Sequence, residues 1–160
     1  MERLNQVRSA TDEDQGPAIS LLVFELAGER YGLPSASVRE IVRYRMWTPV
    51  PGAPPALPGI ISQRGVILPI VELRALLNLP EHPPGRSARF AIVQHNDVTM
   101  ALLAETVLDL ADIAERAVAP LPGARDQRRV TFIRGVAVFE DRPLALLDLD
   151  ALILALREGG

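Results

Sequence analysis

Four carboxylates stand where they could support acid–base chemistry: Glu40, Glu72, Glu105 and Asp148. Two carboxylates that share a pocket can act as general acid and general base in a hydrolase if the pocket shifts their pKa values. Glu72 and Asp148, however, each directly precede a leucine-spaced segment, where a negative side chain stabilises the positive end of a helix. A carboxylate-based hydrolase is therefore an alternative interpretation, and helix capping is the simpler role for two of the four residues.

Other catalytic and metal-binding groups are scarce in the 160 residues. The chain has no cysteine, which excludes disulfides and thiol catalysis, and its only histidines are His82 and His95. Neither a histidine-based metal centre nor a cofactor is expected. The net charge of −3 and the aromatic content of 4% do not favour phosphate attraction or base stacking. A small-barrel nucleic-acid-binding module is therefore a second, weaker alternative, and nucleic acid is not an expected partner.

Arg64 is the basic residue whose position is best defined by its surroundings. Residues 59–61 and 66–71 are apolar runs, and the polar sequence Ser62-Gln63-Arg64-Gly65 separates them. This pattern predicts two strands joined by a tight turn. The turn would hold Arg64 at a fixed, exposed point, and a short helix over residues 72–77 would follow the second strand.

The same strand–turn–strand–helix pattern recurs later in the chain. A shift of 76 positions places Gly59 on Gly135 and Leu68 on Leu144, and it also aligns Glu72 with Asp148. A shift of 69 positions aligns Gly32-Leu33 with Ala101-Leu102 and Val38 with Val107. The chain is therefore predicted to be internally duplicated.

The remaining pattern is that of a mostly β protein. Polar residues 1–18 are predicted to form a flexible tail, because they offer little apolar surface to offset the entropy of ordering. Further strand pairs are predicted over residues 21–26 with 31–34, 89–95 with 98–104, and 133–139 with 143–147. A helix, or a helix that passes into a strand, is predicted at 35–42, a strand at 105–113, a loop at 120–129 and a terminal helix at 148–156. Many short strands with compact turns predict two small barrels.

Several blocks in order resemble the CheW family of chemotaxis coupling proteins. They are residues 24–33, the sequence Val38-Arg39-Glu40-Ile41, residues 51–54, residues 59–74 and residues 144–152. The resemblance covers about residues 20–156 and implies two five-stranded SH3-like β-barrel lobes around a shared apolar core, with short helices and a C-terminal helix. We expect a CheW-like domain at 19–158, with lobe one at about 19–85 and lobe two at about 86–158.

The resemblance implies a non-enzymatic adaptor that couples methyl-accepting chemoreceptors to the histidine kinase CheA. The implied receptor-binding residues are Val38, Glu40, Gly59 and Arg64. The regulatory domain of the kinase is expected on the second lobe, supported by the strand residues Ile92, Val93, Leu102 and Leu103, of which some face the core and others face outward. A bidentate pair between Arg64 and Glu40 is also expected.

Three positions depart from the family pattern. The usual Asn-Leu-Arg-Gly turn is replaced by Ser62-Gln63-Arg64-Gly65, and Glu72 and Glu105 stand where aspartate is usual. No apolar stretch reaches the roughly 20 residues of a membrane-spanning helix, and the charged start lacks a signal-peptide core. We therefore expect a cytoplasmic protein recruited to membrane-associated receptor arrays, with no direct membrane insertion. The departures leave open which receptor and which motility pathway it serves.

Overall fold

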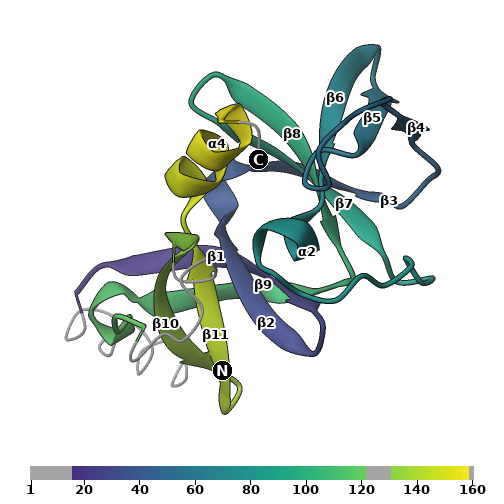
Figure 1. The fold of residues 1–160 in the computed structure, drawn as a ribbon. Helices are drawn as coiled ribbons and strands as arrows, with labels where there is room; N and C mark the ends of the chain where they lie inside the picture. Colours follow the sequence, from purple (N-terminus) through teal and green to yellow (C-terminus); the bar gives the residue numbers. More distant parts are fainter. Residues whose placement is uncertain (1–15, 122–130, 159–160) are drawn as a thin grey trace.

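Two β-sheets and a few short helices make up the computed structural model, which describes residues 16–121 and 131–158 (Figure 1). The five-stranded sheet has the strand order β10-β11-β2-β1-β9. Its strands are β1 (Ala18–Leu26), β2 (Glu29–Pro34), β9 (Thr106–Ala114), β10 (Ile133–Phe139) and β11 (Arg142–Leu147). The predicted mostly β fold class is therefore confirmed.

The six-stranded sheet has the strand order β3-β7-β8-β6-β5-β4. Its strands are β3 (Val38–Arg43), β4 (Thr48–Pro49), β5 (Gly59–Gln63), β6 (Val66–Val71), β7 (Arg89–His95) and β8 (Val98–Ala104). A 3-10 turn, η1 (Ser35–Ser37), leads directly into β3, which confirms the predicted passage from helix to strand. Its counterpart η2 (Glu115–Ala117) follows β9.

The internal duplication is visible in the sheet topology. The order β9-β1-β2-β11-β10 in one sheet matches β3-β7-β8-β6-β5 in the other, strand for strand. The central parallel pairs match as well, because Ile70 pairs with Ala101 and Leu146 pairs with Gly32. Ile70 and Leu146, the equivalent residues of the two pairs, are 76 positions apart, and Gly32 and Ala101 are 69 positions apart, which are the shifts that the sequence comparison found.

The two halves of the chain exchange their first hairpins. β1 and β2 belong to the sheet that β9, β10 and β11 complete, whereas β7 and β8 lie at the centre of the sheet that contains β3 to β6. A sheet boundary therefore does not coincide with the lobe boundary predicted near residue 85. The reason is that the last strand of each half, β6 or β11, pairs in parallel with the first hairpin of the other half.

A shared apolar core joins the sheets. Its buried members come from both, with Phe24, Tyr31 and Leu33 on one side and Val93 and Leu102 on the other. Two smaller clusters fill the far side of each sheet. Within the described residues each sheet is open, and short contacts between its two ends, such as the Ala119–Val136 bridge, take the place of a continuous barrel ladder.

The helices close the core. α2 (Leu73–Leu76) begins at Glu72, whose carboxylate accepts from the Arg74 backbone N–H at 3.1 Å, and α4 (Leu149–Arg157) begins at Asp148, whose carboxylate accepts from Ala151 at 3.1 Å. The helix-start role predicted for both carboxylates is confirmed. No helix in residues 16–121 and 131–158 is long and apolar enough to cross a membrane.

Candidate functional site

The turn between β5 and β6 holds Arg64 in a strained but suitable backbone conformation. Arg64 has φ +52° and Gly65 has φ +78°. A two-residue hairpin turn with positive φ at both central positions matches the right-handed twist of the flanking strands. The guanidinium side chain is 77% exposed, so the turn presents it to solvent as predicted.

Glu40 of β3 receives this guanidinium in a two-bonded arrangement. Arg64 Nε donates to Glu40 Oε2 at 3.0 Å and Nη2 donates to Oε1 at 3.3 Å, while Gln63 Nε2 donates to Oε1 at 3.4 Å. Arg45 Nη2 donates to the Ser62 carbonyl at the same turn. The expected bidentate pair is therefore present, and it ties the edge strand β3 to the β5–β6 turn across the open side of the six-stranded sheet.

Both members of the pair are charged over a wide pH range. The hydrogen bond from Arg64 lowers the pKa of Glu40 from its ordinary value of 4.5, and this effect outweighs the partial desolvation of the carboxylate. The same bond raises the pKa of Arg64. The pair is thus an ion pair at neutral pH, with the carboxylate oxygens directed at the turn rather than free for catalysis.

Gly59 and Val38, the other two predicted receptor-binding residues, have packing roles. Gly59 is buried, and a Cβ atom there would overlap the Thr48 carbonyl oxygen and the Trp47 indole, whose Cζ3 would be 2.7 Å away. Val38 is half-buried and packs on the shared core. Of the four predicted receptor-binding residues, the structure joins Glu40 and Arg64 directly and gives Gly59 a packing role beneath the Trp47 loop.

The four predicted kinase-binding side chains are not on the surface. Ile92, Val93, Leu102 and Leu103 are all buried, with exposed fractions of 4%, 0%, 1% and 9%. Ile92 and Leu103 lie in one cluster, and Val93 and Leu102 lie in the shared core on the opposite face. The expectation that some of them face outward is wrong, because β7 and β8 are central strands covered on both faces.

Several large apolar side chains near the Glu40–Arg64 pair are exposed. They lie on β3, on β6 and in the loop after β3. Ile41 follows Glu40 on β3 and is 41% exposed, and Val66 and Ile67 follow the Arg64 turn on β6 with exposed fractions of 56% and 67%. Met46, in the loop after β3, is 85% exposed. Sequence periodicity missed these exposed side chains because the run 66–71 is apolar throughout, and only strand pairing decides which of its residues are covered.

The remaining candidate carboxylates take part in helix caps and ion pairs, and both Glu72 and Glu105 contact Arg74. Glu72 and Asp148 cap helices, and Glu105 accepts from the Ala27 backbone N–H at 3.1 Å and pairs with the buried Arg74 at 3.5 Å. Residues 16–121 and 131–158 contain no group of three or more His, Cys, Asp or Glu that could hold a metal ion. Each of the four carboxylates thus has a structural role, in a helix cap or in an ion pair.

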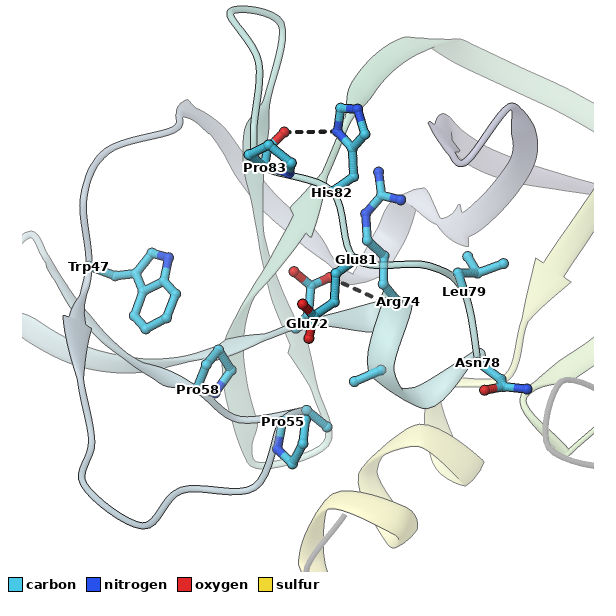
Figure 2. A pocket seen from close by; sticks show the side chains of 12 residues that line it. Trp47, Pro55, Pro58, Glu72, Arg74, Asn78, Leu79, Glu81, His82 and Pro83 are labelled. Atoms are coloured by element: carbon cyan, nitrogen blue, oxygen red, sulfur yellow. Dashed lines mark hydrogen bonds between the residues drawn. The ribbon is translucent and has the colours of Figure 1, made fainter.

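Glu72 also lines a hollow of about 970 Å³ beside α2 (Figure 2). Trp47, Pro55 and Pro58 form one wall, and the segment after α2, including His82, forms the other. Burial raises the pKa of Glu72, with a smaller contribution from repulsion by Glu81. The His82 ring nitrogen Nδ1 lies 2.8 Å from the Pro83 carbonyl oxygen, and the residue is exposed, which agrees with the predicted loop role.

A family model for the CheW-like domain matches residues 20–157. The chain belongs to the CheW family. The family match covers almost all of the described residues, including both sheets and the Glu40–Arg64 pair, so the resemblance on the sequence blocks is confirmed. As a CheW family member the chain is a non-enzymatic scaffold of chemotaxis-type signalling.

Individual relatives agree with this assignment. The chemotaxis protein CheW of Bacillus subtilis is 27% identical over 133 residues, which cover 83% of this chain and 85% of the relative. That of Rhizobium meliloti is 30% identical over 132 residues, covering 82% and 85%. The crystal structure of the scaffolding protein TtCheW from Thermoanaerobacter tengcongensis superposes with a TM-score of 0.76 at 27% identity, covering 84% and 86% of the two chains.

Proposed function

We propose that this CheW family member couples the cytoplasmic tips of methyl-accepting chemoreceptors to the regulatory domain of the histidine kinase CheA. It would act in the cytoplasm at membrane-associated receptor arrays. The observation that carries the receptor half of the proposal is the Glu40–Arg64 ion pair, which fixes two strands beside exposed apolar side chains. An apolar surface flanked by oriented charges suits the apolar face of a receptor helix.

The receptor would contact β3 and the β5–β6 turn. Arg64 and Glu40 would set the spacing of the strands, Ile41 and Ile67 would supply apolar contacts, and Gly59 with Val38 would hold the site from within. The altered turn residues Ser62 and Gln63 lie in the same place, and Gln63 bonds to Glu40. Receptor preference would therefore depend on them.

A charge-exchange series tests this assignment. Arg64→Glu and Glu40→Arg should each weaken binding of a purified receptor-tip fragment, and the double exchange should recover part of the loss because the two side chains touch. The matched control is Arg134→Glu, which breaks a 3.7 Å ion pair with Glu115 on the other sheet. Strictly additive losses, or an equal loss in the control, would show that the pair does not organise receptor binding.

The kinase would contact outward-facing residues of the five-stranded sheet, which contains the later strands of lobe two. Leu110 on the edge strand β9 is 66% exposed and Val138 on the edge strand β10 is 68% exposed. Leu110→Glu and Val138→Glu should weaken binding of the kinase regulatory domain without changing the circular dichroism spectrum. If Ile67→Glu alone abolishes kinase binding, the kinase site lies on the six-stranded sheet instead.

A further inference from the structure

A second hollow, of about 270 Å³, is lined mostly by arginine. It lies where β3 ends and β7 begins, on the six-stranded sheet, and its lining contains Arg43, Arg86 and Arg89 together with Tyr44. Three of its six lining residues are therefore cationic, in a chain whose net charge is −3. None of these residues has a role in the proposed receptor or kinase contacts.

Two of the three arginines are neighbours across the sheet. Arg43 and Arg89 are direct partners in the antiparallel β3–β7 ladder. Side chains of direct partners extend from the same face with Cβ atoms roughly 5 Å apart, and like charges in this position destabilise the pair. Arg86 adds a third positive charge from the turn that precedes β7.

The described part of the chain supplies no counter-charge at this place. Arg89 Nη1 donates to the backbone carbonyls of Arg86 at 3.2 Å and Ala88 at 2.8 Å, and within residues 16–121 and 131–158 none of the three arginines is in an ion pair. Glu105 contacts the same turn through its backbone, but its carboxylate is paired with Arg74 and the Ala27 N–H. Among the described residues, therefore, no ion pair offsets this repulsion.

The backbone around the hollow is held in place. The Ala88 N–H donates to the Gly85 carbonyl at 3.2 Å, the Tyr44 N–H donates to the Ala88 carbonyl at 3.2 Å, and the Ser87 hydroxyl donates to the Glu105 carbonyl at 3.0 Å. These bonds fix the backbone of the turn beside the end of β3, so a ligand would have to order only the arginine side chains.

We propose that this hollow binds a compact anion of the multivalent phosphate class. Guanidinium groups bind phosphate oxygens through paired, charge-assisted hydrogen bonds. A single carboxylate would balance one of three positive charges, whereas a diphosphate balances most of them, and the small volume suits a compact ion. Binding would remove the repulsion between β3 and β7 and so stabilise β3, the strand that also carries Glu40.

Inorganic pyrophosphate is the probe for this site. Isothermal titration calorimetry of the full chain at about 150 mM salt should show saturable binding of one pyrophosphate ion per chain. Arg43→Gln and Arg86→Gln should each weaken it about tenfold or more, because each removes charge-assisted hydrogen bonds. The matched control is Arg39→Gln, which makes the same charge change on β3 at an arginine that bonds to Gln94 instead, and its affinity should stay within about twofold of the wild type.

Thermal unfolding tests the same site, because Arg43→Gln should affect the melting temperature differently without and with the ion. Without the ion, Arg43→Gln should melt no lower than the wild type, because it removes a like-charge pair. With the same concentration of pyrophosphate, the melting temperature of the wild type should rise by more than that of Arg43→Gln. The proposal is overturned if the wild type shows no saturable binding, if Arg39→Gln weakens binding as much as Arg43→Gln, or if citrate binds more tightly than pyrophosphate.

Discussion

Replacing Gly59 with alanine tests the packing that supports the proposed receptor site. A Cβ atom at Gly59 would overlap the Thr48 carbonyl oxygen and the Trp47 indole, so the new methyl group cannot be accommodated by a side-chain rotation alone. Because β4 pairs with β5 through Thr48 and Pro49, the added atom must push the short strand away. Overpacking of this kind lowers the free energy of unfolding by about 1–3 kcal/mol. Because one of the overlapping atoms is the Thr48 backbone oxygen, we expect a loss near ~3 kcal/mol for Gly59→Ala.

Two other glycines supply graded controls. At Gly135 a Cβ would meet Val118 Cγ1 at 2.5 Å and the Ala119 carbonyl oxygen at 2.9 Å, so Val118 can move and the cost should be about 1–2 kcal/mol. At Gly85 nothing lies within 4 Å, and Gly85→Ala should change stability by less than about 0.5 kcal/mol. The expected order of destabilisation is therefore Gly59, then Gly135, then Gly85.

Differential scanning calorimetry of the three variants measures this order. A domain of this size loses roughly 2–4 °C of melting temperature per kcal/mol, so Gly59→Ala should melt about 6–12 °C below the wild type. Urea unfolding at 25 °C should give the same order in midpoints. If Gly59→Ala melts together with Gly85→Ala, the close approach of Trp47 and Thr48 to Gly59 is not a constraint, and the packing role assigned to Gly59 is wrong.

Three further predictions follow from the carboxylates. Burial raises the pKa of Glu72 above its ordinary value of 4.5, so ionisation of Glu72 opposes folding. Glu72→Gln should therefore have a higher free energy of unfolding than the wild type above pH 4.5 and the same value below it, as measured by urea unfolding across the pH range. A difference that does not depend on pH would contradict this reasoning. Asp148→Ala should lose about 1 kcal/mol with the cap of α4, while Asp148→Asn keeps most of it, both measured by urea unfolding. Arg74→Met should cost about 1–3 kcal/mol, less than for a fully buried pair because the Glu105 side chain is 30% exposed, and adding Glu105→Gln should recover part of it in a thermal-melt cycle.

Local signals in the sequence predicted the elements well. Apolar runs separated by turn residues placed the hairpins, and the positive φ at Arg64 and Gly65 agrees with the predicted tight turn. The shifts of 76 and 69 positions correspond to real strand equivalences. β1 begins at Ala18, the last residue of the predicted tail, and residues 1–15 of that tail lie outside the described residues, as does most of the predicted 120–129 loop.

Pairing between distant strands could not be predicted in the same way. The exchange of hairpins depends on which free strand edge a hairpin meets, and hydrophobic periodicity within one segment carries no such information. The burial of Ile92 and Leu103 did have a signal, since continuous apolar runs such as 90–93 and 100–104 are typical of strands covered on both faces. The closeness of Arg43 to Arg89 and of Trp47 to Gly59 follows only from strand register.

The exchange of hairpins has a consequence for the order in which the chain can fold during synthesis. The six-stranded sheet uses residues 38–104 only, so all its strands are available once the ribosome has released that stretch. The hairpin of β1 and β2 is made first but pairs with β11, more than a hundred residues later. Until then β2 has an unpaired edge, and long-range parallel pairing is slow. The first hairpin to be synthesised is therefore the last to be completed, and the time needed to translate the intervening residues is the minimum interval during which the edge of β2 stays unpaired.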